Sequence, residues 1–114
     1  MSTLKNSVKL IGNVGQTPEI RELESGKKMA RFSVATNESY YNKQGEKVTQ
    51  TYWHNLVAWG KTAEVIENYV QKGNQIAIEG KLTNRTYEGQ DGQKHYITEV
   101  LVNEIVLLGA KAKS

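Results

Sequence analysis

Apolar and polar residues alternate along several short stretches of the chain, and this period of two predicts β-strands. Residues 29–39 are the clearest case, because Ala30, Phe32 and Val34 fall on one face and mostly polar side chains on the other. Runs rich in β-branched or aromatic residues predict further strands over residues 8–14, 51–60, 75–87 and 96–108. The chain is therefore expected to be mainly β, with a bulge or bend at Gly80.

One segment after Gly60 has the period of a helix instead. Apolar residues recur at helical spacing over residues 63–70. Thr62 is a suitable N-cap, Lys72 is expected in the last turn, and Gly73 is expected directly after the helix. The pattern thus predicts a single amphipathic helix between the third and fourth strands.

The remaining residues form connections. Residues 15–28 contain a turn signal at Ser25–Gly26, residues 40–47 are expected to be a polar loop, and Asp91–Gly92 marks a hairpin turn. Three strands, one helix and two strands is the order of an OB-fold, an all-β five-stranded Greek-key barrel, although other small α+β sheets share this pattern. We expect one domain over residues 1–108, followed by a short basic end at 109–114.

The strand predicted at residues 51–60 carries both tryptophans of the chain. Alternation places Trp53, Asn55, Val57 and Trp59 on one face, with the rings roughly 20 Å apart at about 3.3 Å per residue. Large aromatic side chains usually belong to a core. Two flat rings along an open groove would instead suit stacking of successive nucleobases. The pattern of this strand leaves both interpretations open.

Composition limits the classes of function. The chain has 114 residues, no cysteine, and 15 Lys and Arg against 12 Asp and Glu, with a pI of about 9.1. The absence of cysteine excludes disulfides and thiolate metal sites. No apolar run is long enough for a membrane span, so a cytoplasmic protein is expected. The mild basic excess is compatible with a polyanionic partner.

Motifs for catalysis and cofactors are incomplete. Gly60-Lys61-Thr62 resembles the end of a phosphate-binding loop, but the glycine required five residues earlier is Asn55. The stretch from Gly12 to Gly15 lacks the third glycine of a dinucleotide site. The two histidines have no carboxylate or cysteine at metal-ligand spacing. We therefore expect no enzyme, no metal and no cofactor.

Basic residues accompany several of the aromatic ones. Lys43 follows Tyr40 closely, Lys61 follows Trp59, and Arg85 precedes Tyr87. Each pair by itself is common on protein surfaces. Together on one barrel they fit a groove that neutralises phosphates and stacks bases.

Several sequence blocks resemble bacterial single-stranded DNA-binding proteins. The match runs from Asn6 to Leu108 in the right order and with close spacing. Its most specific parts are the Trp53-His54 pair, the Gly-Lys-x-Ala-Glu start of the helix at Gly60, and the Ile-Glu-Gly strand at Ile78. The chain is identified on these blocks as a member of that family.

The resemblance implies an OB-fold homotetramer in the cytoplasm, associated with the nucleoid, that wraps single-stranded DNA without sequence preference in replication, recombination and repair. It places the base-stacking aromatic residues at Tyr40, Trp53, Trp59 and Tyr87. It places the phosphate-binding cations at Lys43, Lys61, Lys72 and Arg85. This aromatic set favours the interpretation in which the Trp53–Trp59 face of the strand points outward and does not belong to the core. His54 matches a histidine that the family places near a subunit contact. Asn55 stands where the family commonly has a basic residue, so the phosphate contact made by that basic residue is not expected here.

The end of the sequence departs from the family. Members usually continue into a long flexible tail with an acidic tip that recruits replication and repair enzymes, whereas this sequence ends in a short basic stretch at 109–114. Recruitment of such enzymes through a tail is therefore not expected of this form. Two other functions remain open from the residues: a primosome-type docking barrel, which tends to lack the full aromatic set, and an RNA-binding barrel.

Overall fold

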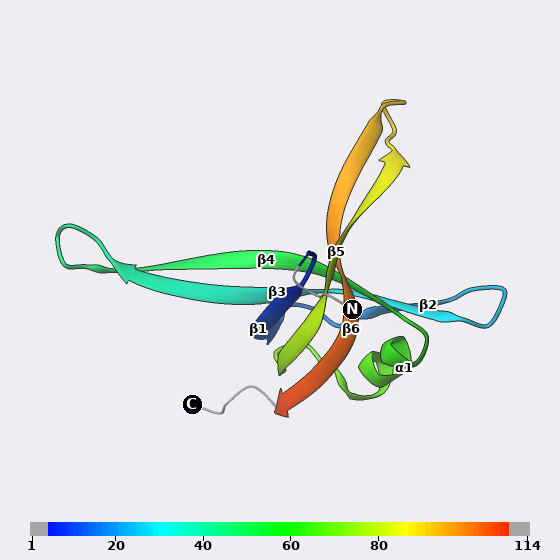
Figure 1. Ribbon diagram of the computed structural model, residues 1–114, viewed down its shortest axis with the longest axis horizontal. Helices are drawn as coiled ribbons and strands as arrows, with labels where there is room; N and C mark the ends of the chain where they lie inside the picture. The colour runs from blue at the N-terminus through cyan, green and yellow to red at the C-terminus, as the bar shows by residue number, and fades with distance from the viewer. Residues whose placement is uncertain (1–4, 110–114) are drawn as a thin grey trace.

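The computed structural model describes residues 5–109 and shows strands wound into a small barrel with one helix beside it (Figure 1). The predicted end segment therefore lies outside the described residues from position 110 onward. The elements in chain order are β1 (Val8–Val14), β2 (Glu19–Glu22), β3 (Lys28–Tyr41), β4 (Lys47–Trp59), α1 (Gly60–Tyr69), β5 (Gln75–Glu88) and β6 (Lys94–Gly109).

Five of the strands form a closed ring. The sheet order is β1-β5-β6-β4-β3-β2, and an additional pairing of β1 with β3 closes the barrel. All pairings are antiparallel except β4 with β6, which is parallel at Leu56 with Val100 and Val57 with Leu101. This arrangement confirms the predicted OB-type barrel. The short strand β2 was not predicted; it pairs only with β3, and it forms because the turn at Ser25–Gly26 folds the chain back along that strand.

The barrel interior is filled by the apolar face that the alternation predicts. Phe32, Leu56 and Ile76 are almost completely inaccessible to solvent. The helix α1 packs against β3, β4 and β6 and adds Ala63 and Ile66 to the same cluster. Each buried side chain of this size contributes roughly 1.5–3 kcal/mol to folding. The core therefore fixes which face of each strand points outward.

Two glycines allow strands to approach closely within this barrel. A Cβ atom on Gly12 would lie 2.2 Å from the backbone oxygen of Ala35, and one on Gly80 would lie 2.1 Å from that of Leu101. The register between β5 and β6 shifts between Glu79 and Gly80. The predicted irregularity at Gly80 is therefore confirmed, and it lies where the backbone of the neighbouring strand leaves no room for a Cβ atom.

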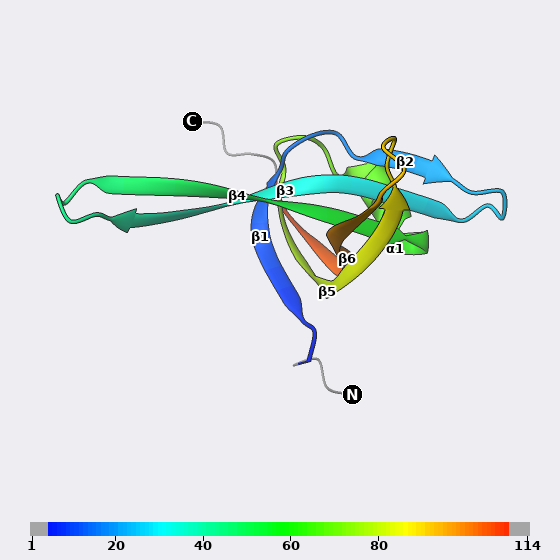
Figure 2. The same ribbon diagram turned by 90° about the horizontal axis from the view of Figure 1, so that it is seen from above.

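Long hairpins extend beyond the barrel in different directions. The β3–β4 hairpin and the β5–β6 hairpin form two separate arms, and in Figure 1 the first extends to the left and the second upward (Figures 1 and 2). The predicted turn at Asp91–Gly92 is confirmed at the tip of the β5–β6 arm. The polar loop at the tip of the β3–β4 arm is shorter than predicted, because Tyr40 and Tyr41 continue the ladder of β3 opposite Val48 and Lys47.

The helix differs from the sequence prediction at both ends. Its N-cap is Trp59, which makes no side-chain capping bond, so the assignment of Thr62 as N-cap is wrong. Gly60 starts the helix with a φ of +62°, a conformation that glycine adopts without steric cost. The helix ends at Tyr69, and Lys72 and Gly73 lie in the following turn, where the Gly73 N–H donates to the Val14 carbonyl at 2.8 Å.

Candidate nucleic-acid interface

The outer face of β4 carries the two tryptophans in the open. Trp53 is 61% exposed and Trp59 is 37% exposed, whereas Leu56 and Ala58 on the opposite face are fully buried. The predicted division of this strand into two faces is therefore confirmed. The interpretation of the tryptophan face as core is wrong, because the barrel already has its core on the Leu56 side.

Trp53 forms one wall of an open groove, here called the Trp53 groove, which has a volume of about 510 Å³. The ring lies so close to Gly15 that a Cβ atom there would be 2.2 Å from a ring carbon. Glycine at this position therefore lets the indole ring approach the backbone closely. The residues that line the groove are Gly15, Gln16, Glu19, Arg31, Phe32, Ser33, Trp53 and Asn55.

Trp59 lies in a second groove, the Trp59 groove, of about 450 Å³. The ammonium group of Lys27 is 5.3 Å from the centre of its ring, which is within the range of a cation–π contact. Leu101 and Asn103 from β6 form the opposite side. The groove thus offers an aromatic face with a positive charge beside it.

Tyr87 lies on the β5–β6 arm and belongs to a small stack of side chains. Its ring is stacked on His95 with centres 5.3 Å apart, and the Arg85 guanidinium carbon is 6.0 Å from its centre. His95 also contacts Asp91 at 3.2 Å. The Gln93 backbone N–H and the His95 ring lower the pKa of the Asp91 carboxyl. Because its pKa is lowered in the folded protein, the ionised Asp91 carboxylate stabilises the fold at neutral pH. This stabilisation is lost as pH falls through the lowered pKa.

A buried carboxylate connects two arginines between these aromatic groups. The Glu99 side chain is 6% exposed, and its Oε2 atom lies 3.5 Å from Arg31 Nε and 3.3 Å from Arg85 Nη2. Arg85 Nε also donates to Oε1 at 3.4 Å. The three side chains come from β6, β3 and β5, so the barrel brings them together across three strands.

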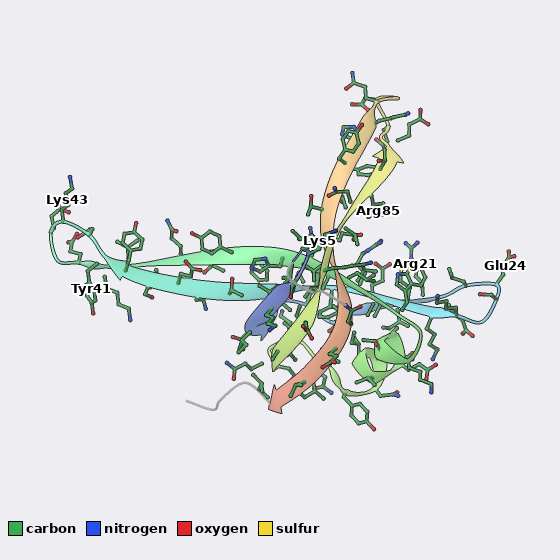
Figure 3. The ribbon with its side chains drawn as sticks, in the orientation of Figure 1. Lys5, Arg21, Glu24, Tyr41, Lys43 and Arg85 are labelled. Atoms are coloured by element: carbon green, nitrogen blue, oxygen red, sulfur yellow. The ribbon has the colours of Figure 1, made fainter. Side chains whose placement is uncertain are left out.

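The other predicted binding residues are more dispersed. Lys43 is at the tip of the β3–β4 arm, far along the molecule from Arg85 (Figure 3). Lys61 and Lys72 are exposed in the first turn of α1 and in the turn after it. The backbone of the latter turn is hydrogen-bonded to Val14 at the end of β1, next to Gly15. The predicted set is thus arranged along an extended path and not in one cluster.

Tyr40 and Trp53 do not share a face of the β3–β4 ladder. Trp53 is opposite Ala35, so the period of two places Tyr41 on the side of Trp53 and Tyr40 on the side of Tyr52. Both Tyr40 and Tyr41 are exposed, at 49% and 72%. The arm therefore presents aromatic rings on both of its faces.

His54 points away from Trp53, as predicted, and is half-buried. Its Nε2 atom makes a 2.9 Å hydrogen bond with the Thr36 hydroxyl. An open depression next to it is lined by Leu10, Ile11 and Tyr52 among others. His54 thus faces a different surface from the two tryptophan grooves.

Sequence reasoning missed three residues of this interface: Lys27, Arg31 and Glu99. The alternation already placed Arg31 on the polar face of its strand. What was lacking was the register of β3 on β4, which pairs Arg31 with Val57 and places Arg31 in the groove that Trp53 and Asn55 also line. A register cannot be derived from the two strand patterns alone when several alignments keep the same faces.

Within residues 5–109, no group of three or more His, Asp or Glu side chains is arranged to hold a metal ion. Over the same residues, the helix is too short and too polar to cross a membrane.

The chain folds as an OB-type barrel, and its two grooves carry exposed tryptophan rings together with basic side chains. The family model described as "Single-strand binding protein family" matches residues 5–108, and the chain belongs to this family. The family is one of binding proteins, which agrees with the expectation that the chain is not an enzyme.

Two known proteins illustrate the similarity. The chain is 41% identical over 107 residues to "Single-stranded DNA-binding protein 1" of Chlorobaculum tepidum, covering 93% of this chain and 66% of that protein. The chain therefore spans slightly less than two thirds of that relative. A solved structure described as "Plasmodium falciparum SSB complex with ssDNA" matches with a TM-score of 0.81 and 33% identity, over 90% of this chain and 94% of the other.

Proposed function

We infer that this chain binds single-stranded DNA without sequence preference and protects it during replication, recombination and repair, in the cytoplasm and at the nucleoid. The observation that carries this inference is the exposure of Trp53 and Trp59 on one strand, each in a groove that a cationic side chain also lines, Arg31 or Lys27. Every nucleobase has a π-face, so stacking on these rings tolerates any sequence. The cations would neutralise the phosphates between the bases.

Titration of labelled oligonucleotides tests this function. Matched single-stranded DNA, duplex DNA and RNA are compared by fluorescence anisotropy at several salt concentrations. We expect tight binding of single-stranded DNA of any sequence and much weaker binding of the duplex, whose bases are already stacked. The RNA arm measures preference between the two sugars, since stacking and phosphate contacts do not distinguish them. Duplex binding as tight as single-strand binding would contradict the proposal.

The proposed contacts follow an extended path over the molecule. Stacking is assigned to Tyr40, Trp53, Trp59 and Tyr87, and phosphate contacts to Lys43, Lys61, Lys72 and Arg85. All of these side chains reach the surface: the four aromatic residues are between 37% and 61% exposed, and the Arg85 side chain is 41% exposed. A strand in contact with both arms and the barrel would have to curve around the molecule. This geometry favours wrapping of the DNA strand around the protein and not binding along a short linear site.

Lys72→Ala is expected to reduce the salt dependence of binding. One lost phosphate contact lowers the slope of log K against log salt by about 0.7 for a single strand, with no gain in base preference. The slope is measured by titration between low and moderate salt. Lys28→Ala is the control, because Lys28 is bonded to Glu67 of the helix at 2.6 Å on the other side of β3. An unchanged slope in the Lys72 variant would remove Lys72 from the interface.

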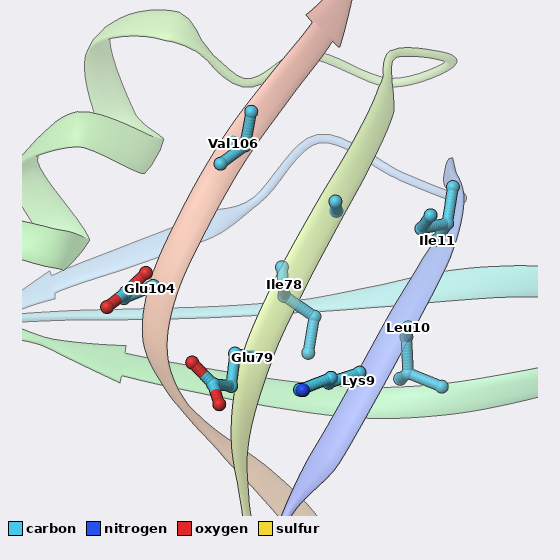
Figure 4. A pocket seen from close by; sticks show the side chains of 8 residues that line it. Lys9, Leu10, Ile11, Ile78, Glu79, Glu104 and Val106 are labelled. Atoms are coloured by element: carbon cyan, nitrogen blue, oxygen red, sulfur yellow. The ribbon is translucent and has the colours of Figure 1, made fainter.

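We propose that the chain assembles as a homotetramer with His54 near a subunit contact. One OB barrel accommodates only about 4–16 nucleotides, so wrapping a longer strand requires several barrels. An apolar region on the outer face of β1, β5 and β6 supports a contact between copies (Figure 4). Ile11 on β1 and Val106 on β6, which lie on either side of β5 in this region, are 62% and 55% exposed. Ile11 also borders the depression at His54, so the two surfaces are continuous.

Ile11→Glu is expected to convert the tetramer into smaller species. In a two-fold interface the same residue is present on both sides, so one substitution brings two carboxylates into the contact. Light scattering at micromolar concentration measures the mass. Val65→Glu, at a similarly apolar exposed position on α1, is the control and should leave the mass unchanged. A wild-type protein that is monomeric at this concentration would exclude the tetramer and the wrapping that depends on it.

A further inference from the structure

We propose that Arg31, Glu99 and Arg85 form one phosphate-binding bridge between Trp53 and Tyr87, in which Arg31 contacts the DNA and Glu99 positions both guanidinium groups. This inference rests on the proposed binding of single-stranded DNA and adds two residues to it. It also explains how the groove keeps a cation next to Asn55, where the resemblance to the family led us to question a phosphate contact.

The location of the three side chains is the first support. Arg31 lines the Trp53 groove together with Asn55. Arg85 lies beside the ring of Tyr87, with the guanidinium carbon 6.0 Å from its centre. In a single strand a phosphodiester separates each base from the next. A strand with bases stacked on Trp53 and on Tyr87 would therefore carry its phosphates past this cluster.

Burial determines the direction in which the cluster faces. The Glu99 side chain is 6% exposed, whereas the side chains of Arg31 and Arg85 are 31% and 41% exposed. The Glu99 carboxylate therefore lies behind the two arginine side chains, and an approaching phosphate meets the guanidinium groups first. One carboxylate against two guanidinium groups gives the cluster a formal charge of +1. Glu19, which lines the same groove, is paired with Arg21 at 3.5 Å.

The contacts within the cluster are loose, which leaves donors for a ligand. Charge-assisted hydrogen bonds are usually about 2.7–2.9 Å long. The contacts to Glu99 here measure 3.3–3.5 Å, and Arg31 Nε is buried without a well-aligned hydrogen bond. The outer N–H groups of both arginines can therefore donate to a phosphate while Glu99 holds the inner side of each group.

Glu99 is a positioning residue in this scheme. Arginine side chains have many rotamers, and a buried carboxylate restricts them before DNA binds. The alternative is that Glu99 only reduces the positive charge of the groove and so weakens DNA binding. The two roles predict opposite effects when the charge of Glu99 is removed.

Arg31→Ala tests the first half of the proposal. We expect the slope of log K against log salt for a labelled oligothymidylate to fall by about 0.7, which corresponds to roughly fourfold weaker binding at 0.15 M salt. Arg31→Lys should recover most of the slope because the charge is kept. Lys28→Ala on the opposite side of β3 is the control. If the slope for Arg31→Ala equals that of the wild-type protein and of Lys28→Ala, Arg31 does not contact DNA. In that case, binding of the oligothymidylate by the wild-type protein would still support the proposed function.

Glu99→Gln tests the second half. We expect weaker binding and a slope lower by about 0.7, despite the added positive charge, because one arginine is no longer held in place. In the Arg31→Ala, Arg85→Ala background the same change should have no further effect on binding. Tighter binding with a steeper slope would instead show that Glu99 reduces affinity, and an undiminished effect in that background would show a general structural role. Thermal unfolding of each variant establishes that it is folded, and the Arg31 variants test the bridge should Glu99→Gln not fold.

Discussion

Replacing Trp53 with Ala is expected to weaken the binding of single-stranded DNA by about 5- to 150-fold. Stacking of a base on an aromatic side chain contributes about 1–3 kcal/mol, and each 1.4 kcal/mol corresponds to a factor of ten. Trp53 is the most exposed of the four proposed stacking residues and forms the wall of its groove. Its removal should therefore reduce affinity for every base sequence to a similar extent.

Stability should change little in this variant, because the indole is 61% exposed and lies outside the core cluster. Trp53→Tyr should keep part of the affinity, since it keeps an aromatic face. Tyr69→Ala is the matched control: Tyr69 is 64% exposed at the end of α1 and lines a different depression from the two tryptophan grooves. If Trp53→Ala binds as tightly as Tyr69→Ala, then Trp53 does not stack with DNA.

Gly80→Ala is expected to have the largest effect on the fold, with a loss of at least about 3 kcal/mol in the free energy of unfolding. Overpacking of a core usually costs 1–3 kcal/mol when side chains can move aside. Here the added Cβ atom would lie 2.1 Å from the backbone oxygen of Leu101, which is part of the paired strand β6. The barrel would have to separate two strands to accommodate it, and total stability is only about 5–15 kcal/mol.

Urea unfolding of Gly80→Ala and Gly45→Ala separates steric overlap from backbone strain. Gly45 has a φ of +77° but open space around its Cβ position, so alanine there should cost only about 1–2 kcal/mol. A loss for Gly80→Ala that is no larger than for Gly45→Ala would contradict the close approach of β5 and β6.

The barrel was predictable because its strands have one buried and one exposed face. The alternation around Phe32 and Leu56 separates the two faces of each strand and keeps Trp53 and Trp59 together on the face opposite Leu56. The pattern alone left open whether that face belonged to the core, and only the resemblance to the family favoured the outward orientation. The turn at Asp91–Gly92 was also predictable, since glycine provides the positive φ of +78° and the aspartate accepts the Gln93 N–H.

The contacts between strands were not predictable in the same way. The proximity of Arg31, Glu99 and Arg85 depends on the registers of β3, β5 and β6, and each local pattern is compatible with other registers of the same parity. The helix start was misplaced because Thr62 is a common capping residue, whereas the structure uses the positive φ of Gly60 to turn from β4 into α1. The strand registers and the start of the helix depend on how the barrel closes, which is a property of the tertiary structure and not of the local sequence.

The tryptophan fluorescence of the protein during titration with single-stranded DNA tests the central claim most directly, because both tryptophans of the chain lie on the proposed binding face. Trp53→Phe and Trp59→Phe, each with a single remaining tryptophan, are titrated with oligothymidylate and with a mixed-sequence strand. We predict saturable quenching of the emission in both variants with both strands, and little quenching with duplex DNA. Binding detected by anisotropy without any change in tryptophan emission would contradict stacking on this face of β4.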